Sequence, residues 1–260
     1  MSSGTPNLDD LSNDCLALII SVTNPLDACR SSLVSKSFNS AAGSDVLWDK
    51  FLPADHQNLV PASPSFSSLK SLYLSLCDHP VLIEDGKKSF SLDKRSGKKC
   101  YMLASRNLAI AWGDTPLYWR WISIPDSRFP EVAELLVVCR FEITGRIDSC
   151  NLSLMTRYNA FLVFKLVAYA EGFENKPIEA SFRLGGIQVS KQIVYVDVDS
   201  RRVAQNGERY PKVRGDGWFE VELGEFFNGG GLEELEIHIF LHDGYSVGGL
   251  YVQGIDIRPC

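Results

Sequence analysis

The chain has 260 residues, and 26 Lys and Arg against 32 Asp and Glu give it a net charge of -6. With 45% hydrophobic and 22% charged residues, it can bury enough apolar surface to offset the entropy of ordering, which excludes a wholly disordered chain. The acidic balance argues against a strongly basic nucleic-acid-binding protein. The length fits either one large domain or a small domain followed by a larger one.

The cysteines, the N-terminal residues and the length of the apolar runs indicate the cellular compartment of the protein. The seven cysteines are odd in number and widely scattered, which favours reduced, mostly buried thiols over a disulfide framework. No pair has the spacing of a zinc knuckle, so we expect no structural metal and no cofactor. The N-terminus lacks the basic and apolar regions of a signal peptide, and no apolar run approaches the roughly 18 to 20 residues of a membrane span. We expect a protein of the nucleus and cytoplasm that has no membrane partner.

Residues 8–52 have apolar side chains at helical intervals and predict three short helices. Asn24 and Pro25 break the first helix from the second, Asp27 is a candidate N-cap of the second, and residues 40–45 separate the third. A bundle of about 45 residues buries too little surface to be stable alone. We therefore expect this region to lean on a partner.

The next segment, residues 53–80, is predicted to be a linker that ends in a helix. Residues 53–64 are rich in Pro, Ser and Ala, as in a connector. Phe66, Leu69 and Tyr73 then return to helical spacing. This helix could pack on either neighbouring domain.

After residue 80 the periodicity changes from helix to strand. Strict alternation of apolar and polar residues is plain in residues 218–223 and 234–239. Many short strands with few helical windows favour an antiparallel β-sandwich of the jelly-roll type, so the fold class is α+β multidomain. The predicted strands are residues 99–103, 108–112, 119–124, 136–143, 160–170, 180–184, 193–198, 218–223, 235–241 and 250–257.

The first region resembles an F-box in residues 8–20, 28–30, 34–38 and 47–52. The resemblance implies a three-helix module that docks on the Skp-type adaptor of a cullin-RING ubiquitin ligase, over residues 1–52. By the family pattern, five residues would face the adaptor: Leu11, Leu16, Ile19, Ile20 and Pro25. Val34, Phe38 and Trp48 would serve the internal core. The alternative is that all these apolar residues belong to the core of an ordinary bundle.

One position departs from the F-box pattern. Where the family typically has Leu-Pro, this chain has Leu11 and Ser12. A proline would rigidify the segment that enters the interface. We therefore expect weaker docking here.

The second region looks like the phloem protein 2 family of plant lectins, also called Nictaba-like. The matching stretches are residues 105–121, 131–135, 141–147, 158–165, 214–218, 223–228 and 254–259. Together with the F-box, they resemble the F-box members of this plant family. The resemblance implies that residues 81–260 form a β-sandwich lectin that binds glycans or glycoproteins containing N-acetylglucosamine.

The family implicates two tryptophans near the start of the domain in sugar binding, and these positions are Trp112 and Trp119 here. A hairpin turning at residues 113–117 would bring them together, flanked by Asp114 and Tyr118. Aromatic faces stack on pyranose rings while carboxylates bond the hydroxyls. Core packing is the alternative for each tryptophan.

Among the acidic residues, Glu225 is the preferred carboxylate of the sugar site, because it stands beside a glycine turn. Glu220 and Glu222 share one strand face and are further candidates. The alternative for both is a solvated strand face.

Parts of the sequence are also compatible with other functions. Carboxylate pairs suit a glycosidase, but no catalytic motif accompanies them, so we expect a non-catalytic receptor subunit. A sandwich that binds a protein degron without sugar remains an alternative. A basic cluster is compatible with RNA or phosphate, although a solvated hairpin is the simpler interpretation; it comprises Lys87, Lys88, Lys94, Arg95, Lys98 and Lys99.

Overall fold

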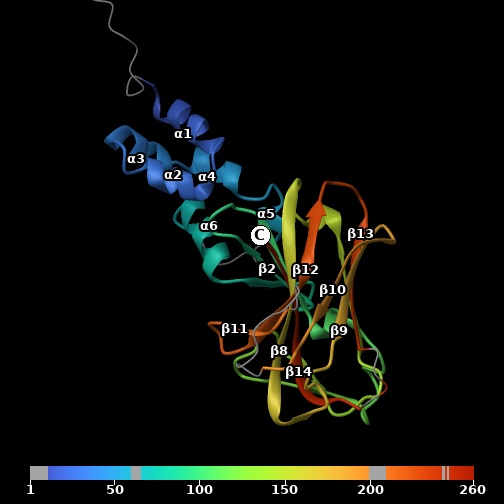
Figure 1. The fold of residues 1–260 in the computed structure, drawn as a ribbon. Helices are drawn as coiled ribbons and strands as arrows, with labels where there is room; N and C mark the ends of the chain where they lie inside the picture. Colours follow the sequence, from blue (N-terminus) through green and yellow to red (C-terminus); the bar gives the residue numbers. More distant parts are fainter. Residues whose placement is uncertain (1–10, 60–65, 199–208, 242–243, 245) are drawn as a thin grey trace, which may run out of the picture. The chain divides into compact units, whose positions relative to one another are not determined.

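A computed structural model describes residues 11–59, 66–198, 209–241, 244 and 246–260 (Figure 1). The first three residues of the stretch that resembles an F-box, residues 8–10, lie outside this part. The chain forms two compact units: the residues up to Val81 with Phe90–Lys99, and Leu82–Ser89 with Cys100–Cys260. Of the helices that the structure describes, none combines the length and apolar character needed to span a bilayer.

The first unit is helical. Its helices are α1 (Asn13–Ser21), α2 (Pro25–Ser31), α3 (Lys36–Gly43), α4 (Asp45–Phe51), α5 (His56–Leu59) and α6 (Leu69–Asp78). Short polar side chains cap five of them at the N-terminus: Ser12, Asn24, Ser35, Ser44 and Ser68. Each accepts a hydrogen bond from a backbone N–H that the helix itself leaves unpaired.

Four helices, and not the predicted three, lie between residues 13 and 51. The missed helix is α3, whose polar residues Ser37, Asn39 and Ser40 obscure its periodicity. Only two small residues, Ala41 and Ala42, are buried from it, so it lacks the large apolar residues that predict a helix. Asn24, and not Asp27, is the N-cap of α2.

Helix α6 is a packed part of the helical unit. Tyr73 of α6 lies against Trp48 of α4, with ring centroids 5.0 Å apart. The Asp45 carboxylate accepts a hydrogen bond of 2.8 Å from the Leu69 backbone N–H, and the Tyr73 hydroxyl donates to the Asp93 carbonyl at 3.1 Å. The predicted linker helix therefore packs on the helical side.

The second unit is an antiparallel β-sandwich (Figure 1). Its larger sheet has the order β1-β2-β3-β14-β8-β12-β11, with β5 and β6 paired beside β14; the smaller sheet has the order β10-β9-β13-β7-β4. The strands are β1 (Val81–Ile83), β2 (Lys88–Leu92), β3 (Lys99–Ala104), β4 (Ala109–Ile110), β5 (Trp119–Ile122), β6 (Val132–Leu135), β7 (Glu142–Asp148), β8 (Thr156–Glu171), β9 (Ile178–Leu184), β10 (Ile187–Val194), β11 (Lys212–Val213), β12 (Phe219–Asn228), β13 (Glu234–Leu241) and β14 (Gly248–Pro259). The predicted fold class is confirmed.

Aromatic side chains from both sheets fill the space between them. Phe226 of β12 stacks on Tyr158 of β8 at 5.6 Å and on Phe182 of β9 at 6.0 Å. Gly145 of β7 faces this core, where a Cβ atom would lie 2.9 Å from Ile255. These contacts fix which face of β7 points outward, because successive side chains of a strand alternate between faces.

The predictions for one strand and for the cysteines are wrong. The predicted strand at residues 136–143 spans the connection between β6 and β7, because an apolar run does not reveal where pairing starts. The thiols are free, but they are not mostly buried. Five of the seven are exposed: Cys15, Cys29, Cys139, Cys150 and Cys260.

Candidate functional site

The segment that carries Trp112 is a loop between the two sheets. β4 pairs with β7 in the smaller sheet, whereas β5 pairs with β6 in the larger one. The predicted hairpin of these two strands is therefore wrong. The chain instead passes through tight turns, in which the Gly113 N–H donates to the Ile110 carbonyl and the Thr115 N–H to the Trp112 carbonyl.

Two indole groups fasten this loop. Trp119 is 2% exposed, and its Nε1 donates to the Ala111 carbonyl at 3.2 Å. Trp121 donates from Nε1 to the Gly113 carbonyl at 3.1 Å. The bonded carbonyls flank Trp112 on both sides. Because the Trp119 ring is buried, it offers no open face to a ligand and holds the loop that carries Trp112.

Trp112 itself projects outward. Its side chain is 45% exposed, and its backbone has a φ of 57°, a conformation that is rare for a bulky residue. Tyr118 lies beside it with ring centroids 5.5 Å apart. Asp114, in the same loop, is exposed. The structure thus brings three of the predicted sugar-site residues into one loop.

A pocket of about 360 Å³ opens beside Trp112. Its lining includes Arg140 and, from the outward face of β7, Glu142 and Thr144. Such a combination of one exposed aromatic ring with a carboxylate, a guanidinium and a hydroxyl suits a ligand that presents both C–H and hydroxyl groups. The sequence prediction did not name these three polar residues.

Glu142 is the fixed carboxylate of this pocket. Arg140 donates from Nε to its Oε2 at 2.7 Å, and His238 Nε2 lies 3.1 Å from its Oε1. Partial burial raises the pKa of Glu142, but the hydrogen bonds with His238 and Arg140 outweigh it and hold the pKa below its ordinary value. The group is therefore ionised and oriented at neutral pH.

Glu225 does not reach this pocket. It is exposed on β12 of the larger sheet, and its Oε1 lies 3.7 Å from Arg157 Nη1. Its neighbour Phe226 points into the core, so Glu225 faces outward from the sheet opposite to β7. Glu222 is paired with Arg209 at 3.3 Å.

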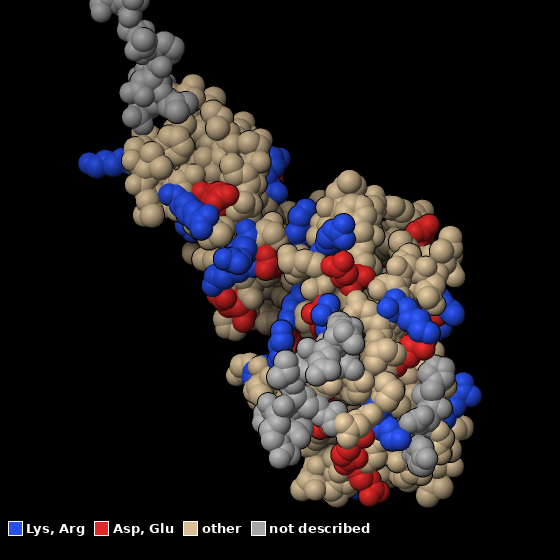
Figure 2. All heavy atoms as spheres, in the orientation of Figure 1, with Lys and Arg blue, Asp and Glu red and all other residues tan. Residues whose placement is uncertain are grey.

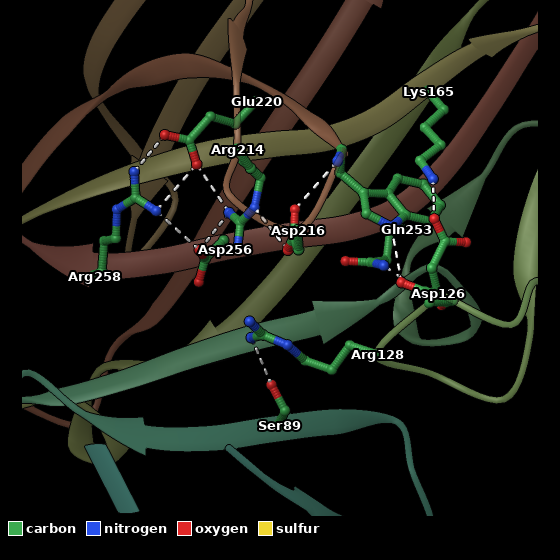
Figure 3. Close-up of polar contacts among 12 residues, drawn as sticks. Ser89, Asp126, Arg128, Lys165, Arg214, Asp216, Glu220, Gln253, Asp256 and Arg258 are labelled. Atoms are coloured by element: carbon green, nitrogen blue, oxygen red, sulfur yellow. Dashed lines mark hydrogen bonds and ion pairs between the residues drawn. The ribbon is translucent and has the colours of Figure 1, made fainter. Parts of the chain in front are cut away.

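Glu220 is committed to an ion network on the larger sheet (Figure 3). Arg214 bonds Glu220 at 2.8 Å and Asp256 at 3.0 Å, and Arg258 bonds Glu220 at 2.6 Å. Burial lowers the pKa of Arg214, but the carboxylates of Asp256, Asp216 and Glu220 together outweigh this effect and raise the pKa. The matching stretch 214–218 thus has a structural role, in which buried Trp218 donates from Nε1 to the Asp126 carbonyl at 3.1 Å.

The helical unit presents a second candidate surface. Six large apolar residues are exposed on its first three helices and their connections: Leu11, Leu18, Ile19, Val22, Leu33 and Val34. Val22 and Leu33 are 84% and 86% exposed.

Two of the five residues predicted to face the adaptor, Leu11 and Ile19, belong to this surface. The other three, Leu16, Ile20 and Pro25, are buried in the unit itself. Val34 is exposed, so its predicted core role is wrong.

The basic cluster is largely paired with acids. Lys94 bonds Asp78 and Lys99 bonds Asp55 within the helical unit, and Lys88 bonds Glu84 in the other unit. Figure 2 shows Lys and Arg side chains interspersed with Asp and Glu on the face that it draws. This arrangement does not favour a polyanion such as RNA.

Comparison with known proteins gives the same division of the chain. Residues 98–259 match the family Phloem protein 2, and residues 8–50 match the F-box domain. The Arabidopsis thaliana F-box protein PP2-B10 is 48% identical over 263 residues, which cover 100% of this chain and 96% of that protein. Putative F-box protein PP2-B12 of the same plant is 48% identical over 97% of this chain and 98% of its own. F-box protein SKIP3, also from Arabidopsis, is 42% identical over 97% and 88%.

Proposed function

Because the chain belongs to the phloem protein 2 family and carries an F-box domain, we propose that it is the receptor subunit of an SCF-type ubiquitin ligase that selects substrates by their glycans. The F-box implies binding to a Skp-type adaptor and, through it, to a cullin. The sandwich then holds a glycoprotein or a free glycan containing N-acetylglucosamine. The glycan specificity is the new part of this proposal.

The exposed apolar surface of the helical unit supports adaptor docking. Val22, Leu33 and Val34 are nearly free of contact with their own unit. A group of large exposed apolar side chains on a soluble domain marks an interaction surface. Its burial by the adaptor would add the stability that a small helical bundle lacks.

The observation that carries glycan binding is the presentation of Trp112. Its ring is held outward by a loop fastened at Ala111 and Gly113, beside a pocket that contains ionised Glu142. A rigid aromatic face with nearby polar groups binds a pyranose at small entropic cost, because little must be ordered on binding.

The receptor promotes ubiquitination by bringing the substrate close to the ligase. F-box proteins of this family are substrate-adaptor subunits, which fits a non-catalytic role. Holding a substrate next to the ligase raises the effective concentration of its lysines without a catalytic side chain in this chain.

A second candidate ligand is a protein segment. The loops between β7 and β8 and between β12 and β13 expose Leu154, Met155 and Leu232, the last at 91%. Asn228 joins these loops by donating to the Ser149 and Ser153 carbonyls at 3.1 Å. This apolar end of the sandwich favours contact with a protein, in place of the glycan or beside it.

A glycan array with the full-length protein tests the proposal. We expect binding to glycans that contain N-acetylglucosamine, with a loss of about 5-fold or more in Trp112→Ala, since an aromatic contact of this kind contributes about 1 kcal/mol. Leu117→Ala is the matched control, because Leu117 is exposed in the same loop and should leave binding unchanged. Equal binding by both variants would refute the site, and no binding by the folded wild type would favour the protein ligand.

A further inference from the structure

Three pockets of the sandwich unit adjoin one another, and β7 lines the first two. The Trp112 pocket shares Ala109 and Thr144 with a second pocket of about 440 Å³. The second shares Lys87 and Arg106 with a third of about 310 Å³. We name these three adjoining pockets together the β7 groove.

The groove follows the outward side chains of β7. Glu142 and Thr144 line its first part, and Thr144, Arg146 and Asp148 line its second. The seven residues of β7 span about 20 Å at the usual rise per strand residue. A site of this length accommodates several linked sugar rings and is longer than a monosaccharide needs.

Both cations and carboxylates line the far end of the groove. Lys87, Lys88, Arg106 and Arg146 line the second pocket, against the carboxylates of Asp148 and Glu234. The unit itself neutralises three of these cations, because Lys88 pairs with Glu84, Arg106 with Glu131, and Arg146 with Glu236.

Lys87 has no carboxylate partner among the residues that the structure describes. Its backbone is fixed, because its N–H donates to the Glu84 carbonyl at 3.1 Å and its carbonyl accepts from the Ala104 N–H at 2.9 Å. Lys87 lines both the second and the third pocket, so its side chain extends from a fixed backbone where the two pockets adjoin.

Arg106 beside it is pre-oriented. Its guanidinium lies 3.8 Å from the ring centroid of Trp121, and Nε and Nη2 bond the same oxygen of Glu131 at 2.9 and 2.8 Å. Stacking on an aromatic ring fixes the plane of the guanidinium, and a planar fork suits a carboxylate. Arg106 and Lys87 both line the second and third pockets, so an anionic group bound there would lie near both side chains.

We propose that the β7 groove binds an oligosaccharide that carries an acidic sugar, with one ring stacked on Trp112 and a uronic acid carboxylate held by Lys87 and Arg106. This inference rests on the proposed glycan binding and adds that the bound glycan is acidic. A long polyanion such as RNA fits less well, because Asp148, Glu234 and Glu142 line the same groove.

Calorimetric titration of the full-length protein tests the proposal with three probes. These are a hexasaccharide that carries one uronic acid, the same hexasaccharide with that carboxylate methyl-esterified, and a hexamer of N-acetylglucosamine. The first two share a backbone and differ in charge. We expect the acid to bind about 5-fold more tightly than its ester, the ratio that one exposed ion pair provides.

Lys87→Gln should bring this ratio close to one without changing the affinity for the ester. Lys212→Gln is the matched control, because Lys212 is exposed on β11 of the other sheet and should preserve the ratio. Equal binding of acid and ester by the wild type, or an unchanged ratio in Lys87→Gln, would overturn the inference. Displacement of the acid by single-stranded RNA, with a steep salt dependence, would overturn it as well.

The outcomes also separate the two proposals. If the neutral hexamers bind in a manner that depends on Trp112, and the acid binds no better, only the acidic specificity fails. If none of the three probes binds, the glycan function fails with it.

Discussion

Trp112 occupies a backbone conformation that costs energy. At a φ of 57° a bulky residue is strained by on the order of 1 to 3 kcal/mol, and such strain persists only where the surroundings hold it. Here the holding groups are two indole N–H donors, from Trp119 and Trp121. The two tryptophans that the family implicates thus have different roles, since one is exposed and the other supports it.

The pH dependence of stability tests the environment of Glu142. Its pKa is depressed in the folded protein, so it stabilises the fold above its unfolded value of about 4.3 and loses this effect as the pH falls through the folded pKa. We expect Glu142→Gln to lower the free energy of unfolding by about 1 kcal/mol or less at pH 7, as partly exposed pairs do.

Urea unfolding at pH 7 and pH 3 measures this difference. The gap between wild type and Glu142→Gln should be narrower at pH 3 than at pH 7, and a gap of equal width at both would contradict the account. Glu225→Gln serves as control, because its pair with Arg157 is exposed on both sides and should contribute little at either pH.

Ser12, which stands where the F-box pattern has proline, is the N-cap of α1. Its Oγ accepts from the Cys15 N–H at 3.3 Å, and its φ of -62° already matches that of proline. We expect Ser12→Ala to destabilise the protein by about 1 kcal/mol. Ser12→Pro should destabilise the protein less than Ser12→Ala does. Proline lowers the conformational entropy of the unfolded chain, which stabilises the folded state by about 0.4 to 1 kcal/mol. Thermal unfolding of both variants checks this, and a larger loss in the proline variant would exclude the proposed compensation.

The family resemblance pointed to Trp112, which lies exposed beside a pocket, but the carboxylate predicted to accompany it, Glu225, lies on the other sheet. Glu225 lies near a glycine turn in sequence, whereas Glu142 reaches Trp112 only because β4 pairs with β7. Pairing between strands more than 30 residues apart depends on register, which alternation within one strand does not determine. The paired partners His238 and Arg140 were missed for the same reason.

At the scale of elements, two devices anchor the irregular segments of the sandwich. The indole donors fasten the loop at residues 111–118, and the ion network of Arg214 fastens the turn that leads into β12 (Figure 3). The network buries charges whose removal leaves partners uncompensated. Loops held in this way present side chains at fixed positions.

Arg214→Ala tests this anchoring. Because it leaves buried Asp256 and nearly buried Glu220 without this partner, we expect a loss of about 3 kcal/mol, the low end for breaking a buried pair. Arg157→Ala, which removes an exposed pair, should cost about 1 kcal/mol or less. Midpoints of urea unfolding compare the two, and equal losses would show that the network is not a stabilising anchor.

The helices and strands that the sequence missed share a physical cause. Helix α3 buries only alanines, and β6 is adjacent to an apolar connection that extends the same run. The long strands were found, apart from their exact ends, because β12 and β13 alternate and because β8 and β14 carry apolar stretches between turn residues. Local pattern thus gave the fold class, while the pairing of β4 with β7 required the whole sheet.

At the scale of the whole molecule, the two units carry separate surfaces. The apolar surface of the helical unit and the β7 groove use no residue in common. A receptor of this design requires that each surface work when the other is disabled. It also requires that one molecule occupy both at once.

Retention of the adaptor on a glycan resin tests this central claim most directly. A resin that carries N-acetylglucosamine oligomers should retain the Skp-type adaptor only when the full-length protein is added. Trp112→Ala should release protein and adaptor together, whereas Ile19→Asp with Val22→Asp should release the adaptor alone. Leu232→Asp, an equal change at an exposed leucine of the sandwich, should retain both. Failure of the wild type to hold the adaptor on the resin would contradict the account.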